Sequence, residues 1–190
     1  MEYLESKNIP TVLTREPGGT NIGQKIRQII LDPKNQSLSN KTELLLYAAD
    51  RSQHVDEKIR PYLNKGYIVI SDRYTDSTIA YQGFGRNLNL ALIKKLNTIA
   101  TGSIIPDITI FLDIDIEKGL NQARSTAQDF RSNNGDRLEQ EKIFFHRTVQ
   151  KGYHYLYKKN KKRYIYILSD DTIEAIHKKI LSKLKKRIKI

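Results

Sequence analysis

A short apolar stretch that ends abruptly in charge is the feature that most constrains the fold of this chain. Residues 67–71 read Tyr-Ile-Val-Ile-Ser, and Asp72 and Arg73 follow directly. A run of apolar, β-branched residues suits a strand that is buried on both faces of a parallel sheet. Ligands of open α/β sheets bind beyond the carboxyl ends of the strands. We therefore expect this strand to deliver a carboxylate that can hold Mg2+ or its water, and a guanidinium that can grip a phosphate.

Residues 74–82 supply hydroxyl and amide groups immediately after the charged pair. An Asp-Arg pair alone would be read as an ordinary surface ion pair that ends a strand. The groups that follow it are of the kind that read a base or a sugar, and they come from Ser77, Thr78, Tyr81 and Gln82. Together these residues favour a site for a phosphorylated nucleotide.

The rest of the chain alternates between strand and helix patterns, which predicts an α/β fold built on a parallel sheet. We expect further strands at residues 9–14, 108–113 and 164–168. Helices are expected over residues 1–7, 20–31, 39–64, 89–101 and 116–124, with one that ends near residue 159 and one that begins at residue 171. A chain of 190 residues suffices for one well-buried domain, and no repeat or low-complexity linker divides it. We therefore expect a single domain over residues 1–190.

Residues 15–20, Arg-Glu-Pro-Gly-Gly-Thr, are expected to form a sharp turn after the first strand. The proline fixes one backbone angle, and the glycine pair permits a close approach to a ligand. Thr20 then caps a helix that carries four isoleucines on one face and Arg27 off that face. These isoleucines are Ile22, Ile26, Ile29 and Ile30.

Tyr47 and Arg51 share a face of the long helix over residues 39–64, because they are four residues apart. An aromatic ring beside a guanidinium can stack on a base and donate to its carbonyl edge. A tyrosine on a helix is also an ordinary packing residue, and the spacing alone favours that interpretation.

Residues 125–136 form a polar stretch that breaks the helix pattern and is bounded by Arg124 and Arg137, with Arg131 inside it. A polar loop of this length in a compact domain is either disordered or a mobile lid. Arginine-rich loops that close over a substrate can stabilise the charge of a transferring phosphoryl group. We expect a lid at about residues 125–137, with its base at the helix that follows.

Composition limits the other classes of function. The chain has no cysteine, its four histidines lack the spacing of a zinc site, and no apolar run is long enough to span a membrane. The net charge of +12 comes from the last 49 residues, which hold 15 Lys+Arg against 3 Asp+Glu, whereas residues 1–141 hold 18 of each. Solvated helix surface explains this charge better than a nucleic-acid patch does.

Five segments, in order, resemble bacterial-type thymidylate kinases over essentially the whole chain. They are TREPGGT (14–20), LLLYAADR (44–51), SDRYTDSTIAYQG (71–83), PDITIFLD (106–113) and GDRLEQE (135–141). The resemblance implies a three-layer P-loop nucleoside-monophosphate-kinase-like fold with a parallel sheet. It also implies transfer of the γ-phosphoryl group of ATP to dTMP with Mg2+, giving dTDP, and it implies a homodimer. The expected location is the cytoplasm, or the plastid stroma if the gene is organellar.

The resemblance also assigns a role to each candidate residue. Arg73 would hold the dTMP phosphate with help from Arg27, and Asp72 would support the metal. On the base side, Tyr47 would stack on thymine, Arg51 would donate to it, and Thr78 and Gln82 would read it. Glu16 would lie near the sugar and the acceptor phosphate. In the lid, Arg131 and then Arg124 are the candidates for stabilising the phosphoryl group, and Arg137 would anchor the lid.

One departure from the family concerns the phosphate-binding loop. The family opens with a strand and a glycine-rich loop whose Lys and Ser/Thr bind the ATP phosphates and Mg2+. No Gly-Lys followed by Ser or Thr occurs in this sequence. A helix tail at residues 1–7 that enters a strand likewise implies an earlier strand in a parallel sheet. We therefore expect the first strand and the P-loop to be absent from this chain.

Three interpretations remain open from the sequence. The first is a thymidylate kinase whose recorded start lies downstream of the true one. The second is a protein that keeps the dTMP site without holding ATP. The third is a basic nucleic-acid-binding protein, which ranks last because no nucleic-acid-binding motif accompanies the charge.

Overall fold

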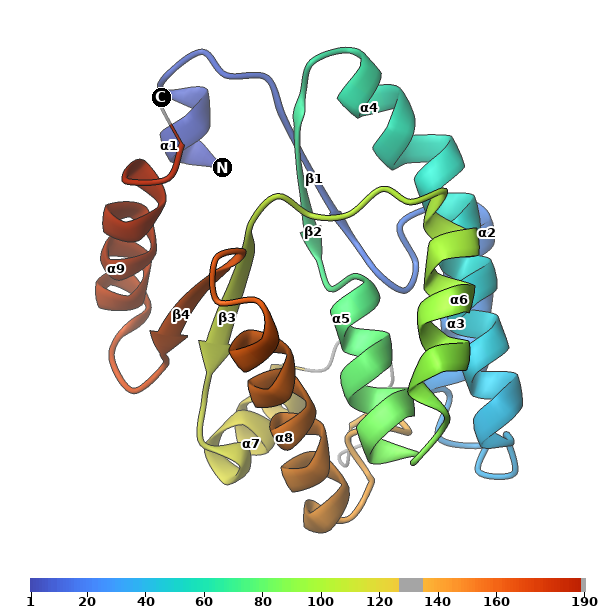
Figure 1. Cartoon of the computed structure of the whole chain (residues 1–190). Coiled ribbons are helices and arrows are strands. Elements are labelled where there is room, and N and C mark those ends of the chain that lie inside the picture. The colour runs from blue at the N-terminus through green and yellow to red at the C-terminus, as the bar shows by residue number, and fades with distance from the viewer. Residues whose placement is uncertain (127–134, 189–190) are drawn as a thin grey trace.

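The computed structural model describes residues 1–126 and 135–188 of the chain. Its strands form two parallel pairs (Figure 1). Strand β1 (Thr11–Arg15) pairs with β2 (Ile68–Asp72), so that Leu13 lies opposite Ile70. Strand β3 (Thr109–Asp113) pairs with β4 (Tyr164–Leu168). The α/β class and the parallel pairing predicted from the sequence are confirmed, and the strand ends agree with the prediction to within two residues.

The two pairs are not joined into one sheet within the described residues. Strand β2 is paired only with β1, and β3 only with β4, so the edges of β2 and β3 that face the middle of the fold lack ladder partners there. This gap agrees with the expectation that the strand between them is not part of this sequence. Large aliphatic side chains on the strands are exposed, including Leu13, Ile110 and Leu112.

Helices surround the strand pairs. Helices α2 (Asn21–Leu31), α3 (Asn40–His54) and α6 (Leu90–Thr101) stand side by side next to β1 and β2, whereas α9 (Ile173–Lys185) packs on β4 at the opposite side (Figure 1). The helical elements are α1 (Glu2–Glu5), α2 (Asn21–Leu31), α3 (Asn40–His54), η1 (Val55–Ile59), α4 (Arg60–Asn64), α5 (Thr75–Thr78), η2 (Ile79–Gly85), α6 (Leu90–Thr101), α7 (Ile116–Thr126), α8 (Ile143–Lys159) and α9 (Ile173–Lys185).

Two of these elements, η1 and η2, are π-helical turns, in which the hydrogen bonds span five residues. The helix predicted over residues 39–64 is continuous, but η1 interrupts its α-helical geometry between α3 and α4. Element η2 carries the segment Tyr81-Gln82 and continues directly from α5. Turns of this type are frequent at functional sites, so η2 marks a region of interest independently of its sequence.

Local capping explains where several helices begin and end. The Thr20 hydroxyl accepts a hydrogen bond from the Gly23 amide at the start of α2, as its position predicts. The Asp115 carboxylate accepts from the Lys118 amide at 3.0 Å, at the start of α7. Gly102 ends α6 in the left-handed region, with φ of 54°, where glycine avoids a steric cost.

The main core lies where α8 packs on η2 and α2. Its buried members are Ile30, Leu31, Ala80, Leu138, Phe145 and Val149. Close approach requires Gly152 on α8, because a Cβ there would lie 2.9 Å from the Ala80 Cα. Only part of the predicted apolar face of α2 is buried, since Ile30 is fully buried but Ile22 and Ile29 are largely exposed. Helix α3 covers one side of α2, and the exposed isoleucines lie outside this contact.

Within the described ranges, none of the helices combines the length and the apolar character that crossing a membrane requires.

Candidate active site

Strands β1 and β2 end together, and their last residues form what we call the exposed strand end: Arg15, Asp72 and Arg73. Arg15 and Asp72 are register partners, and the Glu16 amide donates to the Asp72 carbonyl at 2.9 Å. All three side chains are exposed. Asp72 and Arg15 line a pocket of about 380 Å³ together with Leu13, Thr14, Gly18, Gly19, Gln24 and Lys58. The carboxylate predicted to support a metal therefore faces an open pocket.

Arg73 has an unusual backbone conformation, with φ of 70°. This left-handed region costs a residue with a side chain about 1 kcal/mol or more. The Ser71 hydroxyl donates to the Arg73 carbonyl at 2.8 Å and thereby supports the turn. The guanidinium lies over the Tyr81 ring, 5.2 Å from its centroid. A backbone outlier at a strand end that carries a guanidinium group points to a functional position.

A second group, the buried charge network, lies just behind the strand end and consists of Thr14, Glu16, Arg51, His54 and Asn97. One Glu16 carboxylate oxygen accepts from Arg51 Nε at 2.8 Å, and the other is 2.9 Å from His54 Nδ1. His54 Nε2 lies 2.7 Å from the Thr14 hydroxyl, and Arg51 Nη1 donates to Asn97 at 2.8 Å. Glu16 and Arg51 are only 3% and 1% exposed. Both carboxylate oxygens of Glu16 are therefore occupied inside the protein.

The turn over residues 16–20 is fitted onto this network. The Glu16–Pro17 peptide bond is cis. Gly19 lies against the His54 ring, and a Cβ at this position would come within 2.5 Å of the imidazole. Arg27 lies along Gly18 and donates to the Pro17 carbonyl at 3.2 Å. The glycine pair therefore lets the turn approach α3 and α2 closely, which the sequence had attributed to a ligand alone.

Asp50 of α3 also binds the turn over residues 16–20. Its Oδ1 accepts from the Gly18 amide at 2.9 Å, whereas Oδ2 is buried and finds no hydrogen-bond partner in the described part of the chain. Burial raises the pKa of Asp50 to about 6. A carboxyl group with this pKa changes its charge close to neutral pH.

Part of the predicted base-reading set lies near Arg73, whereas Arg51 belongs to the buried charge network. Tyr47 of α3, Tyr81 of η2 and Tyr153 of α8 all pack against the main core cluster. The Tyr153 hydroxyl is 2.8 Å from the Ser77 hydroxyl. Thr78 and Gln82 lie one turn apart at the junction of α5 and η2 and are almost fully buried.

The base of the predicted lid is fixed to the core through Arg137. Its backbone amide donates to the Leu31 carbonyl at 2.9 Å, its Nε donates to the Ile30 carbonyl at 2.7 Å, and Nη2 contacts Glu43 at 2.5 Å. This geometry suits the predicted anchoring role. Arg131 lies outside the described residues, and Arg124 lies in α7, where its side chain is likewise outside the described part.

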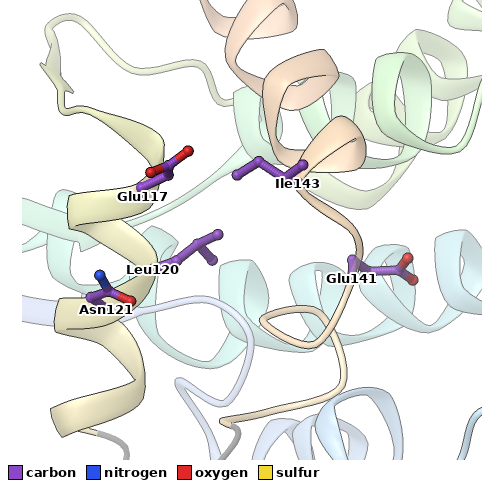
Figure 2. Close-up of a pocket in the computed structure, with 5 residues that line it drawn as sticks. All are labelled: Glu117, Leu120, Asn121, Glu141 and Ile143. Atoms are coloured by element: carbon purple, nitrogen blue, oxygen red, sulfur yellow. The ribbon is translucent and has the colours of Figure 1, made fainter.

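A second pocket, of about 340 Å³, lies between α7 and the start of α8 (Figure 2). It is lined by Glu117, Leu120, Asn121, Glu141 and Ile143, and Figure 2 shows Leu120 and Ile143 facing each other across it. None of the residues predicted for the site lines this pocket. Strand β3 ends nearby in a separate polar cluster, in which Asp113 accepts from Tyr166 and Gln150.

Three residues on α3, Glu43, Asp50 and His54, escaped prediction from the sequence, and so did Asn97 of α6 and Tyr153 of α8. Glu43, Tyr47, Asp50, Arg51 and His54 follow one another at helical spacing along α3, and four of the five are almost fully buried. A stripe of polar residues at the spacing of a buried face is unusual, since unpaired charges are excluded from protein interiors. This stripe of polar residues was the signal in the sequence from which the buried residues of α3 could have been predicted. Asn97 and Tyr153 carried no comparable pattern.

Comparisons with known proteins agree over nearly the whole chain. A family model described as thymidylate kinase matches residues 1–180. A thymidylate kinase from a Nostoc species is 48% identical over 180 residues, which cover 94% of this chain and 83% of that relative. A thymidylate kinase from Halothermothrix orenii is 46% identical and covers 96% and 85%. The crystal structure of thymidylate kinase from Ehrlichia chaffeensis superposes with a TM-score of 0.74 at 33% identity, over 97% of this chain and 86% of that one.

Proposed function

Because this chain belongs to the thymidylate kinase family, we propose that it is a phosphotransferase that moves the γ-phosphoryl group of ATP to dTMP, giving dTDP for nucleotide biosynthesis. Its structural support is the exposed strand end, where the left-handed backbone of Arg73 presents a guanidinium beside an exposed carboxylate. Guanidinium groups bind phosphates with two parallel hydrogen bonds. We assign the dTMP phosphate to Arg73.

Arg27 would support the same phosphate from α2. Its side chain lies along Gly18, at the turn that follows β1. Glu16 was expected beside the sugar and phosphate, but His54 and Arg51 occupy its carboxylate in this structure. We therefore propose that Glu16 acts by holding Arg51 in place.

Thymine would bind among Tyr47, Arg51, Thr78 and Gln82. Tyr47 offers a half-buried ring for stacking. A guanidinium has five N–H groups, of which Glu16 and Asn97 receive two, so that Arg51 is able to donate to a base carbonyl as well. The Thr78 hydroxyl is buried and has no hydrogen-bond partner in the described structure, which fits a group that waits for a ligand.

Asp72 fits one part of a Mg2+ site. Within the described residues, no group of three acidic or histidine side chains could hold a metal ion by itself. Mg2+ in kinases is commonly bound through one or two carboxylates together with substrate phosphates, and a single exposed carboxylate suits this mode. When bound, the ion would neutralise charge on the phosphates. Arg131 and Arg124 are proposed to stabilise the transferring group, and no residue is assigned to the ATP phosphates.

We also propose that the protein acts as a homodimer. Helices α2, α3 and α6 pack side by side, and each exposes large aliphatic side chains. These side chains are Ile22, Ile29, Leu45, Leu92 and Ile99. Light scattering of the purified chain tests this proposal, since an Ile99→Lys variant should then be monomeric. We further propose that the protein acts in the cytoplasm, where free nucleotides are available, or in the stroma if it is plastid-encoded.

The test of the proposed function is dTMP phosphorylation by the wild type and by Arg73→Ala. We expect the variant to lose at least about a thousandfold in kcat/KM with an unchanged circular dichroism spectrum, because a phosphate clamp acts throughout the reaction. Arg60→Ala, which removes an exposed arginine paired only with Asp56 in the salt bridges of the described chain, is the matched control. Unchanged turnover in Arg73→Ala would refute the site. Thermal stabilisation by dTMP without turnover in the wild type would support a binding protein that lacks an ATP site.

A further inference from the structure

Glu43 occupies an unusual position at the start of α3. Its side chain is fully buried, and four hydrogen bonds from three side chains converge on its carboxylate. Gln82 Nε2 donates to Oε1 at 2.8 Å, and Arg137 Nη2 donates to Oε2 at 2.5 Å. Arg86 donates to both oxygens, at 3.3 Å from Nε and 3.1 Å from Nη2. So far this carboxylate has appeared only as a contact of Arg137 at the base of the predicted lid.

We propose that Glu43 fixes the orientation of the Gln82 amide and thereby makes the base subsite selective for a base that carries a ring N–H group. The proposal rests on the assignment of Gln82 to the base subsite made above. Glu43 is a positioning residue in this scheme, since it acts through Gln82 and does not touch the nucleotide.

The first step of the argument is that Glu43 can only accept hydrogen bonds. Burial would raise the pKa of Glu43, but hydrogen bonds from Arg86, Gln82 and Arg137 outweigh burial and hold the pKa below its ordinary value. The group is therefore ionised, and an ionised carboxylate has acceptors only.

The second step concerns the amide of Gln82. A glutamine amide has a donor end and an acceptor end that are nearly identical in shape, so packing alone does not choose between the two orientations. An acceptor-only partner does choose, because the NH2 group must face it. The oxygen of Gln82 is then the end that remains for a ligand.

The third step is complementarity to the base. Thymine carries a ring N–H at N3 beside carbonyl oxygens, whereas cytosine carries a ring acceptor at N3 and an amino group in place of one carbonyl. An amide oxygen from Gln82 matches the thymine N–H. The buried Thr78 hydroxyl, which has no partner in the described structure and lies four residues before Gln82, can donate to a neighbouring carbonyl. Cytosine would place an acceptor against an acceptor, and buried unpaired polar groups are strongly disfavoured.

The fourth step is that Glu43 itself cannot turn away. Arg86 also pairs with Glu141 at 2.5 Å and lies over the Phe145 ring, and Arg137 is bonded to the end of α2. The guanidinium groups of Arg86 and Arg137 are each bonded to other parts of the protein as well. They therefore hold the Glu43 carboxylate in place, and Glu43 in turn holds the Gln82 amide. A network in which every member is satisfied is rigid, which a selective site requires.

The experiment measures the dissociation constants of dTMP and dCMP by titration calorimetry on the full chain, without ATP. We expect the wild type to prefer dTMP, and Glu43→Gln to lose at least about tenfold of that preference, because a glutamine at this position can donate and lets the Gln82 amide turn over. Glu141→Gln is the matched control, because its amide oxygen still accepts from Arg86 and Glu43 keeps its charge, so the preference should be unchanged.

A second variant is needed because Glu43→Gln leaves the guanidinium groups of Arg86 and Arg137 without their carboxylate and could fail to fold. Glu43→Asp keeps the charge but shortens the side chain, so it should remain folded and should also lose the preference. If a folded Glu43 variant keeps the full preference for dTMP, or if the wild type has none over dCMP, this inference is overturned. A wild type that binds neither nucleotide would overturn the proposed function instead, together with everything that rests on it.

Discussion

The exposed strand end and the buried charge network lie one residue apart in the sequence, yet they differ in almost every physical respect. Glu16 is enclosed and has partners for both carboxylate oxygens, whereas the neighbouring Arg15 and its register partner Asp72 face an open pocket. Arg51 is likewise held at two of its nitrogens, whereas Arg73 is exposed in a left-handed turn. Motif residues that look alike in the sequence therefore divide into buried groups, which are bonded mainly to other parts of the protein, and exposed groups, which face solvent or an open pocket.

This division predicts how substitutions should separate stability from activity. Loss of a buried charge leaves its partners unpaired in the interior, so its main effect should be a lower free energy of unfolding. Loss of an exposed charge should leave the free energy of unfolding nearly unchanged while the reaction suffers. The four substitutions below are ordered by the size of their expected effect on that free energy.

Glu16→Ala should cause the largest loss, about 3–5 kcal/mol, because it strands a buried guanidinium and removes the partner of His54. Urea unfolding followed by circular dichroism measures it. Glu57→Ala removes an exposed carboxylate from a neighbouring helical turn and is the control. A loss below about 1 kcal/mol for Glu16→Ala would show that the network contributes little.

Asp50→Asn should change how stability depends on pH. The pKa of Asp50 is raised to about 6 from a value near 3.8, so its contribution is fully present below pH 3.8 and is lost as pH rises through 6. The asparagine variant should therefore gain up to about 3 kcal/mol relative to the wild type at pH 7–8, and this gain should vanish near pH 4. Unfolding curves between pH 4 and pH 8 decide the question, and a constant difference across that range would contradict the prediction.

Arg73→Gly should stabilise the protein by about 1 kcal/mol, because glycine adopts φ of 70° without steric cost. The same change removes the proposed phosphate ligand, so activity should disappear while stability rises. Arg73→Ala keeps the steric cost and is the natural comparison, measured by thermal melting under identical conditions. Equal stability of the two variants would show that the backbone of Arg73 is unstrained.

Asp72→Asn should have the smallest effect on unfolding, within about 0.5 kcal/mol, because the side chain is exposed. Its effect should fall on turnover and on the Mg2+ concentration that half-saturates the reaction. Steady-state kinetics over a range of Mg2+ concentrations measure both, with Asp56→Asn as the exposed control. A Mg2+ dependence identical to that of the wild type would remove Asp72 from the metal site.

Most of the fold could be predicted because hydrophobic period and capping act locally. Strand β4 was predicted with its observed bounds, and Thr20 and Gly102 cap helices where the sequence places them. The π-helical turns could not be predicted, since they depend on how α3 and α5 pack against their neighbours. The exposure of Ile22 and Ile29 was also missed, because the period of a helix shows which residues share a face and does not show how much of that face is covered.

The residues of the exposed strand end could be predicted from the sequence, whereas the contacts within the buried charge network could not. The end of β2 was located from a simple change of apolar residues to charge, and Asp72 and Arg73 lie there. The partners of Glu16 were not predictable, because His54 and Asn97 come from α3 and α6, far away in the chain. Pairing over such distances is decided by tertiary packing, which leaves no local pattern around either residue.

The wide turn of η2 also affects how this site can change during evolution. Each residue advances an α-helix by about 100°, so removal of one residue between positions 79 and 85 would convert the π-turn to α-helix and rotate all that follows by that angle. A deletion between Thr78 and Tyr81 would turn Tyr81 and Gln82 relative to Thr78 in a single event. The π-turn is therefore a point at which one mutation could rearrange one whole side of the proposed base subsite.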